Sequence, residues 1–220
     1  MSIADKLVTI AENIEKIDSR AYSAGYTSGG QEAYKAGIEQ GKQDEYDRFW
    51  DAFQRNGNMT SYLNAFAGRG WTDETFKPKY PLTFITNATN MFYYSYVEHI
   101  DCELSFDTYV SLNGTFSDSR VKRISKLKLN HTITFPNNAF SSCTKLTDIS
   151  FVEGSVIGKN ISFKDSPLTV ESMNNIIAVL KDYSNNSATY TVTFKADRED
   201  MLTAEEKAAA TNKGWTLVWS

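Results

Sequence analysis

Apolar residues recur with a fixed period in the middle of the chain. Three segments superpose on one another, namely residues 90–100, 114–124 and 138–149, the last with one residue inserted. Their phenylalanines, Phe92, Phe116 and Phe140, are spaced 24 residues apart. A unit of this size cannot bury its own apolar face, so consecutive units must stack. The pattern predicts stacked coils in which each Phe lies on its counterpart in the next coil.

Three further columns keep their register across these copies. They are Ser95/Ser119/Cys143, Val97/Val121/Leu146 and Ile100/Ile124/Ile149. Each Val/Leu-x-x-Ile step predicts a short strand that pairs in parallel with its equivalents. The outward strip of the resulting sheet would contain His99, Asp101, Arg123, Ser125, Asp148 and Ser150. Cys143 shares a column with two serines, which favours a small buried residue over a reactive thiol.

The N-terminal region has the alternating four-and-three spacing of a heptad seam. Its apolar or small positions are Ile3, Leu7, Ile10, Ile14, Ile17, Ala21 and Ala24. With Leu7 at an a position and Ile10 at a d position, the seam favours trimers or tetramers, and we expect a parallel trimer. Alternatively, this stripe packs on the chain's own domain, as most amphipathic helices do.

Small residues follow the seam at four-residue spacing, at Ala21, Gly25, Gly29, Ala33, Gly37 and Gly41. Each interior glycine costs a helix about 1 kcal/mol relative to alanine, so close helix–helix approach must compensate or the helix breaks near Gly29–Gly30. The sequence leaves both possibilities open. Residues 44–54 then resume a helical pattern with an aromatic face, and Asn56–Gly57 end it.

The C-terminal region reads as a closing segment that shields the last coil from water. Thr169 is placed to cap a helix over residues 170–181, with Met173, Ile176, Ile177 and Leu180 facing inward. Alternating Tyr190, Val192 and Phe194 predict a strand. Thr203 and Glu206 form a capping-box pattern for a second helix, which Gly214 ends before residues 215–219.

Composition and charge exclude several classes of protein. With 220 residues that are 41% hydrophobic and 13% aromatic, the chain can bury a real core. Its net charge of −4 has no long single-sign run, so we expect neither nucleic-acid binding nor membrane insertion. No secretory signal and no run of about 18 apolar residues is visible, which predicts a protein that stays in water.

Candidate chemistry is sparse. The 2 cysteines, Cys102 and Cys143, fit no CxxC pattern and are expected to be buried free thiols. The 2 histidines, His99 and His131, are far apart, so no metal site and no cofactor is expected. The acidic cluster at 197–200 reads as a solvated turn. We expect no enzyme, although a glycosidase, whose two carboxylates need no motif, stays formally possible.

One stretch carries a family resemblance. Residues 135–149 (FPNNAFSSCTKLTDI) resemble the BspA-type leucine-rich repeats, which read roughly I-P-x-x-A-F-x-x-C-x-x-L-x-x-I. The first two copies are looser and lack the Cys. Residues 166–217 and the leader around 46–51 and 66–71 look similar to the corresponding parts of such proteins from gut Firmicutes and their phages. The resemblance implies a virion-associated or tail-associated structural protein.

Together these patterns predict an α+β fold. It would comprise a long N-terminal α-helix, a short leucine-rich-repeat-like solenoid with a parallel β ladder, and a C-terminal α/β cap. The expected regions are 1–56 for oligomerisation or docking, 57–82 as a connector, 83–165 as the solenoid and 166–220 as a cap of helix, strand, helix and strand.

The function expected from this reading is binding or adhesion to a host cell surface by a phage tail or baseplate protein, assembled in the bacterial cytoplasm. The partners would be other copies of the chain, other virion proteins, and a host glycan or protein. The expected contact residues are Tyr93, Tyr94, Tyr96, His99, Lys122 and Arg123. Tyrosines suit such contacts, yet two of the three are equally well explained by packing on the preceding coil. Alternatives are a bacterial surface adhesin and an intracellular assembly scaffold.

Overall fold

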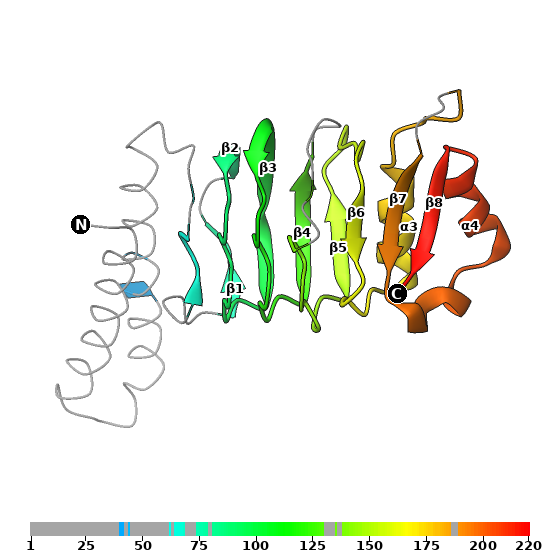
Figure 1. Cartoon of the computed structure of the whole chain (residues 1–220). Coiled ribbons are helices and arrows are strands. Elements are labelled where there is room, and N and C mark those ends of the chain that lie inside the picture. Colours follow the sequence, from blue (N-terminus) through cyan, green and yellow to red (C-terminus); the bar gives the residue numbers. More distant parts are fainter. Residues whose placement is uncertain are drawn as a thin grey trace. The chain divides into compact units, whose positions relative to one another are not determined.

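The structure of the chain is a computed structural model (Figure 1). It describes residues 40–41, 44, 62, 64–68, 74–78, 81–129, 135, 138–185 and 189–220. The chain divides into two compact units, Met1–Met59 and Thr60–Ser220. Three predictions concern residues outside the described ones. They are the heptad seam from Ile3 to Ala24, the possible helix break near Gly29–Gly30, and the aromatic face of the helical pattern over residues 44–54.

The predicted α+β class is wrong for the part of the chain that the structure describes, and no long N-terminal helix lies among those residues. The described residues form an α/β fold of mostly parallel strands with few helices, of which the longest, α3 (Val170–Ala178), has 9 residues. The error came from treating the C-terminal helices as a separate cap. Parallel strands need crossover connections, and these helices are the crossovers.

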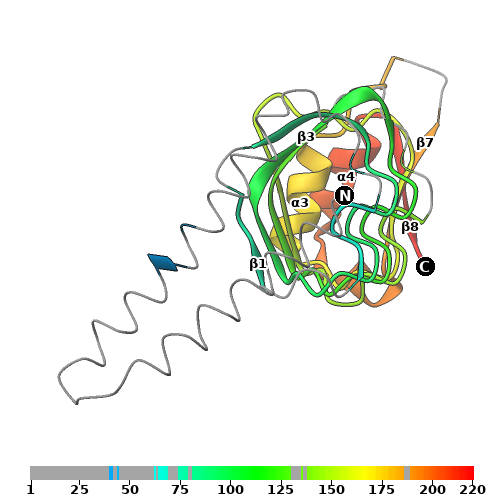
Figure 2. The same cartoon turned by 90° about the vertical axis from the view of Figure 1, so that its left-hand side faces the viewer.

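The larger sheet contains β1 (Thr75–Phe76), β2 (Leu82–Asn87), β3 (His99–Ser111), β4 (Arg123–Lys128) and β5 (Asp148–Phe151). Its order is β1-β3-β4-β5, with β2 also on β3, and every pairing is parallel. Ile100 pairs with Ile124, which pairs with Ile149. The predicted parallel pairing of equivalent repeat positions is therefore confirmed. Viewed along the stack, successive coils lie over one another (Figure 2).

The corners between strands are also bonded from coil to coil. Phe92 N donates to Thr115 O at 2.7 Å, and Phe116 N donates to Ala139 O at 2.9 Å. Backbone groups outside strands need such partners when they are buried. Each coil is therefore hydrogen-bonded to the next on its corner as well as on its sheet face.

An aromatic column runs through the core of the stack. Its members are Phe66, Phe92, Phe116, Phe140, Phe163, Phe194 and Trp219. Neighbouring ring centroids are between 4.7 Å and 6.4 Å apart. The repeat predicted only the three central rings. The outer members were not predicted, because the spacing between them departs from 24 residues.

The serine and cysteine column packs inside the corner. Cys143 is 1% exposed, and its Sγ donates to Phe116 O at 2.8 Å. Burial raises the pKa of the Cys143 thiol to about 12 and also raises that of Cys102. Both cysteines are free and buried, as predicted.

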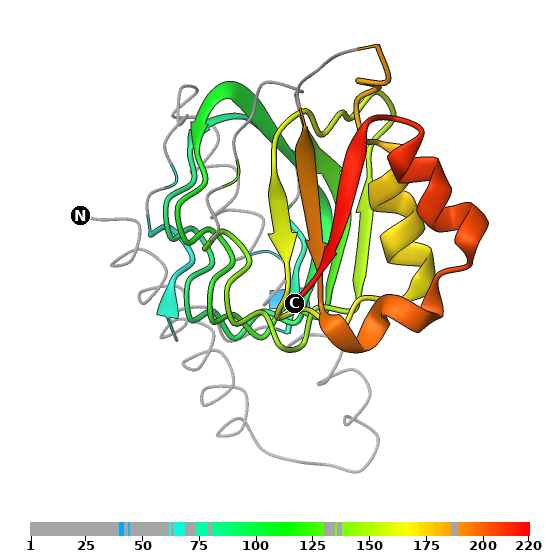
Figure 3. The ribbon, with the colours of Figure 1, turned by 45° about the vertical axis from the view of Figure 1, so that its right-hand side comes forward.

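The C-terminal region is a second parallel sheet with its own crossover helices. The elements are β6 (Ile161–Phe163), α3, β7 (Tyr190–Phe194), the 3-10 helix η2 (Ala196–Met201), α4 (Ala204–Thr211) and β8 (Trp215–Trp219). The strand order is β6-β7-β8, all parallel. Figure 3 shows the three strands side by side, with α3 and α4 beside each other. This region therefore continues the stack as two helix–strand units.

Both crossover helices begin at a threonine cap. Thr169 Oγ1 accepts from Ser172 N, and Thr203 with Glu206 forms the predicted capping box. The first helix is shorter than predicted, because it ends at Ala178 rather than Lys181. Lys213 Nζ donates to the carbonyls of Ile177 and Ala178, which satisfies acceptors at that end. Leu180 is buried outside the helix, in a bridge with Ile157.

Helix α3 covers the edge of the larger sheet. Ile149 N in β5 donates to Ser172 Oγ at 3.0 Å, and Asn175 Nδ2 donates to Ile149 O at 3.3 Å. These side chains bond edge groups that another strand would otherwise take. The larger sheet therefore ends at β5, and α3 lies beside that edge.

Candidate functional site

The outer surface of the stack is organised by contacts between two consecutive coils. The coil that contains β3 supplies aromatic and acidic side chains, and the coil that contains β4 supplies basic ones. The opposed residues are Tyr96 and Arg120, Glu98 and Lys122, Asp101 and Arg123, and Glu103 and Lys126. Each acid or aromatic ring thus faces a cation one coil further along the stack.

The geometry of these contacts is direct. The Arg120 guanidinium lies 4.1 Å from the centroid of the Tyr96 ring. Lys122 Nζ donates to Glu98 Oε2 at 2.5 Å, and this bond holds the pKa of the Glu98 carboxyl below its usual range. Exposed pairs of this kind contribute little to stability, because solvent screens them. Their main effect is to favour one register between the coils.

This arrangement divides the predicted contact residues. Tyr96, Lys122 and Arg123 are engaged with the neighbouring coil. His99 pairs with Arg123 across β3 and β4, and its Nδ1 is buried with no hydrogen bond among the described residues. Only Tyr93 and Tyr94 stand free of the inter-coil contacts described above.

We call Tyr93 and Tyr94 the aromatic corner. The two residues are 38% and 59% exposed, so each presents part of its surface to solvent. The two rings meet edge to face, with centroids 5.2 Å apart and an angle of 73°. The corner thus presents two mutually supported aromatic rings to solvent.

The backbone of the aromatic corner is strained. Tyr94 has a φ of 57°, in the left-handed region that bulky residues rarely adopt. The same region is occupied at the ends of neighbouring turns by Gly68, Asp118 and Ser142. Glycine, aspartate and serine suit a turn better than tyrosine does. The turn therefore does not need an aromatic residue at this position.

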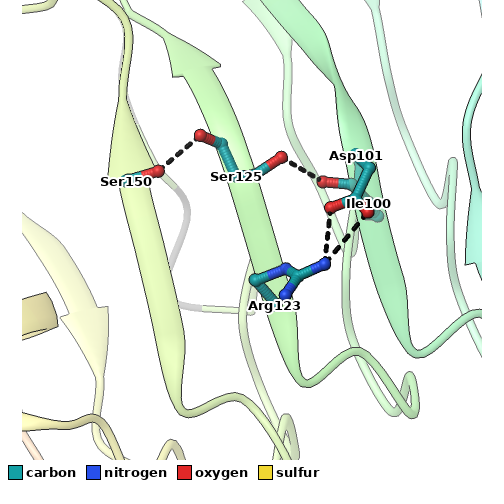
Figure 4. A network of polar contacts seen from close by, with 5 residues as sticks. All are labelled: Ile100, Asp101, Arg123, Ser125 and Ser150. Atoms are coloured by element: carbon teal, nitrogen blue, oxygen red, sulfur yellow. Dashed lines mark hydrogen bonds and ion pairs between the residues drawn. The ribbon is translucent and has the colours of Figure 1, made fainter.

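A second feature lies on the sheet face, beside α3. It is an open pocket of about 360 Å³ on the outer side of β4 and β5. Its lining residues are Arg123, Ile124, Ser125, Asp148, Ile149, Ser150, Glu171, Ser172 and Asn175. Figure 4 shows Arg123, Ser125 and Ser150 on adjacent strands, with Arg123 turned toward Asp101. Guanidinium, hydroxyl, amide and carboxylate groups thus meet around one hollow.

Most of this pocket was missed by the sequence reading. The repeat register did place Arg123, Ser125, Asp148 and Ser150 on one outward strip, but it predicted a strip rather than a hollow. Glu171 and Asn175 come from a helix that was expected to serve only as a cap. A periodic spacing of strands cannot show that a helix will flank their edge.

Other potential chemistry is limited within the part of the chain that the structure describes. No three His, Cys, Asp or Glu side chains gather there as a metal site. Asp197 is paired with Lys195 and Arg198 in the exposed helix η2. Among the described helices, none has the length and apolar character needed to span a bilayer.

No protein-family model, no curated protein and no solved structure gave a significant match to the chain.

Proposed function

We propose that this chain is a non-enzymatic binding protein that contacts its partner through the aromatic corner. The resemblance of residues 135–149 to BspA-type repeats suggests the setting, a phage tail or baseplate protein that meets the host cell surface. In this proposal the partner is a host glycan or surface protein.

The observation that carries the proposal is the exposed Tyr94 on a left-handed backbone. A bulky residue in this conformation costs roughly 1 kcal/mol relative to glycine. Tyr94 is 59% exposed, so burial in the chain's own core does not offset that cost. Strain of this kind is found where surrounding structure holds a residue for a purpose other than stability.

The chemistry of the corner suits recognition. A tyrosine ring offers a large apolar face and a polar tip, and it loses little conformational freedom on binding. The edge-to-face contact of Tyr93 with Tyr94 orients both rings before a partner arrives. The other expected contact residues, Tyr96, Lys122 and Arg123, then act mainly by holding the coils that support the corner.

The test is Tyr94→Gly in the full-length chain, with Ser142→Gly as the matched control. Both residues are exposed at the same left-handed position of neighbouring turns, with φ of 57° and 55°, so glycine relieves similar strain in each. Thermal stability should stay equal or rise in both variants. Binding to immobilised cell-wall material of a Firmicutes host should fall about tenfold or more in Tyr94→Gly only.

Two results would count against the proposal. Equal binding by wild type and both variants would remove the aromatic corner as the contact surface. Equal loss in both variants would show that the turn backbone, rather than the tyrosine ring, matters. Adding Tyr93→Ala to Tyr94→Gly should deepen the loss, since the two rings form one surface.

A further inference from the structure

The pocket beside α3 shares no residue with the aromatic corner, and its polar groups have a distinct pattern of free donors and acceptors. Its donor side is the Arg123 guanidinium. Nη2 of Arg123 donates to both carboxylate oxygens of Asp101, each at 2.9 Å. Nε and Nη1 make no hydrogen bond with the described residues. Arg123 is therefore fixed by one nitrogen and keeps donors for a ligand.

The hydroxyl groups on the floor of the pocket face the ligand as acceptors. Ser125 Oγ donates to Ile100 O at 2.9 Å, and Ser150 Oγ donates to Ser125 O. Figure 4 shows these bonds running across the sheet, from β5 to β4 and from β4 to β3. Because each hydroxyl has one proton and that proton is committed to the backbone, only lone pairs are left.

The wall formed by α3 and the end of β5 supplies further acceptors. Asn175 Nδ2 donates to Ile149 O, which leaves Asn175 Oδ1 as an acceptor. The carboxylate of Glu171, in the first turn of α3, makes no hydrogen bond or ion pair with the residues that the structure describes. Asp148 Oδ2 accepts from Thr147 Oγ1 at 2.6 Å and Asp148 Oδ1 accepts from Thr169 Oγ1 at 3.5 Å, so each oxygen keeps a lone pair for a further donor.

We propose that this pocket binds a sugar residue through a vicinal diol. A guanidinium needs an acceptor, whereas serine, amide and carboxylate oxygens need donors. A hydroxyl group supplies both at one atom, and two neighbouring hydroxyls match the planar, two-pronged groups of Arg123 and Glu171. A volume of about 360 Å³ accommodates one such ring.

Other ligand classes fit less well. An ammonium group offers only donors and would leave the free Arg123 nitrogens unpaired beside a like charge. A carboxylate or phosphate would meet Asp148 and Glu171, whose charges oppose it. A diol can therefore accept from Arg123 and donate to two of the acceptors in the pocket without repulsion from any of its charged groups.

The site is also organised before binding. Asp101 orients Arg123, backbone carbonyls orient both serines, and Ile149 orients Asn175. Groups held in this way lose little freedom when a ligand arrives. An open pocket for a single sugar still predicts weak binding, with a dissociation constant of a few millimolar at best, on the order of 1–10 mM.

The experiment is saturation-transfer difference NMR of the full-length chain with the methyl glycosides of glucose, galactose, mannose and N-acetylglucosamine. Saturable binding of at least one glycoside is expected. Glu171→Gln and Arg123→Gln should each weaken it about tenfold, because each removes a charge-assisted hydrogen bond. Methyl glucuronide, which has the same diol and a carboxylate, should bind more weakly than its neutral counterpart.

Each variant has a matched control. Glu205 occupies in α4 the position that Glu171 occupies in α3, two residues after the capping threonine. Lys122, like Arg123, has an ion pair with an acid of the preceding coil, but it does not line the pocket. Glu205→Gln and Lys122→Gln should therefore leave glycoside binding unchanged.

Several outcomes would overturn the inference. These are no saturable binding of any glycoside, binding that survives both pocket variants, or binding of methylammonium in place of the glycosides. Loss of glycoside binding in Tyr94→Gly would move the sugar site to the aromatic corner.

If a free glycoside binds but a longer glycan carrying the same terminal sugar does not, the pocket serves a free sugar. Equal binding of both marks it as a reader of glycan ends.

Discussion

Single residues in this chain are constrained where one turn must pass close to another. Gly214 lies in the turn between α4 and β8 with a φ of +80°, and a Cβ there would lie 2.9 Å from the carbonyl oxygen of Tyr183. The Tyr183 backbone cannot retreat easily, because its N donates to Lys213 O at 2.8 Å. The requirement for glycine is therefore twofold, in backbone conformation and in space.

We predict that Gly214→Ala lowers the free energy of unfolding by about 2–4 kcal/mol, the sum of left-handed strain and overpacking. Gly68→Ala is the control, since Gly68 has a φ of +74° but nothing within 4 Å of the added Cβ. It should cost only about 1–2 kcal/mol. Urea denaturation of both variants measures the difference, and equal losses would show that the contact with Tyr183 is unimportant.

At the scale of elements, the helices are held in place by side chains at their ends. Thr169 caps α3 and Thr203 caps α4, and each threonine follows a buried leucine, Leu168 or Leu202. Glu206 also accepts from Asn174 of α3. The capping box of Thr203 and Glu206 therefore joins two helices as well as starting one.

This box predicts a pH dependence. Bonds from the Thr203 backbone N–H, from Asn174 and from the Thr203 hydroxyl lower the pKa of Glu206 below its usual 4.5. A lowered folded pKa means that the stabilisation is present above about pH 4.5 and is lost as pH falls through the lower folded value. Glu206→Gln should thus show a smaller fall in urea midpoint between pH 6 and pH 3 than wild type.

Other carboxylates with lowered pKa values, Glu98, Asp182 and Asp197, make wild type itself less stable in acid. The quantity to compare between variants is therefore the slope of the urea midpoint against pH. Glu205→Gln, also in the first turn of α4 but outside the capping box, should follow the wild-type curve. If Glu206→Gln has the same slope as wild type, the capping box contributes no pH-dependent stability.

At the scale of the whole molecule, one aromatic column joins the repeat region to the C-terminal region. Phe140 contacts Phe163 at 4.7 Å, and Phe194 contacts Trp219 at 5.5 Å, so the Thr60–Ser220 unit has a continuous core. A chain of this kind is stabilised by contacts between neighbouring coils. That unit should fold without residues 1–59.

We predict that the full-length chain is a trimer and that residues 60–220 alone are a monomer, as measured by light scattering. The expectation rests on the heptad seam from Ile3 to Ala24, with Leu at a and Ile at d. Ile10→Asp in the full-length chain should also give a monomer, because a charge in the seam is costly to bury. A monomeric full-length chain would favour the intracellular scaffold alternative.

The sequence by itself determined the contacts that repeat with a regular period and the signals that are local. Phe92, Phe116 and Phe140 revealed the stack, Ile100 and Ile124 revealed the parallel register, and Thr203 with Glu206 revealed a helix start. Each depends on spacing or on residues within one turn.

Only the tertiary structure decided what happens where spacing changes or distant segments meet. The aromatic column continues at irregular intervals through Phe163, Phe194 and Trp219, so a fixed period could not predict these members. The two helices expected to form a cap are crossovers of a parallel sheet. Arg123 and Glu171 face one pocket from a strand and a helix that share no pattern. Lys122 forms an ion pair with a neighbouring coil, whereas Tyr94 is exposed to solvent. Which of these happens to a side chain depends on long-range packing that local sequence does not encode.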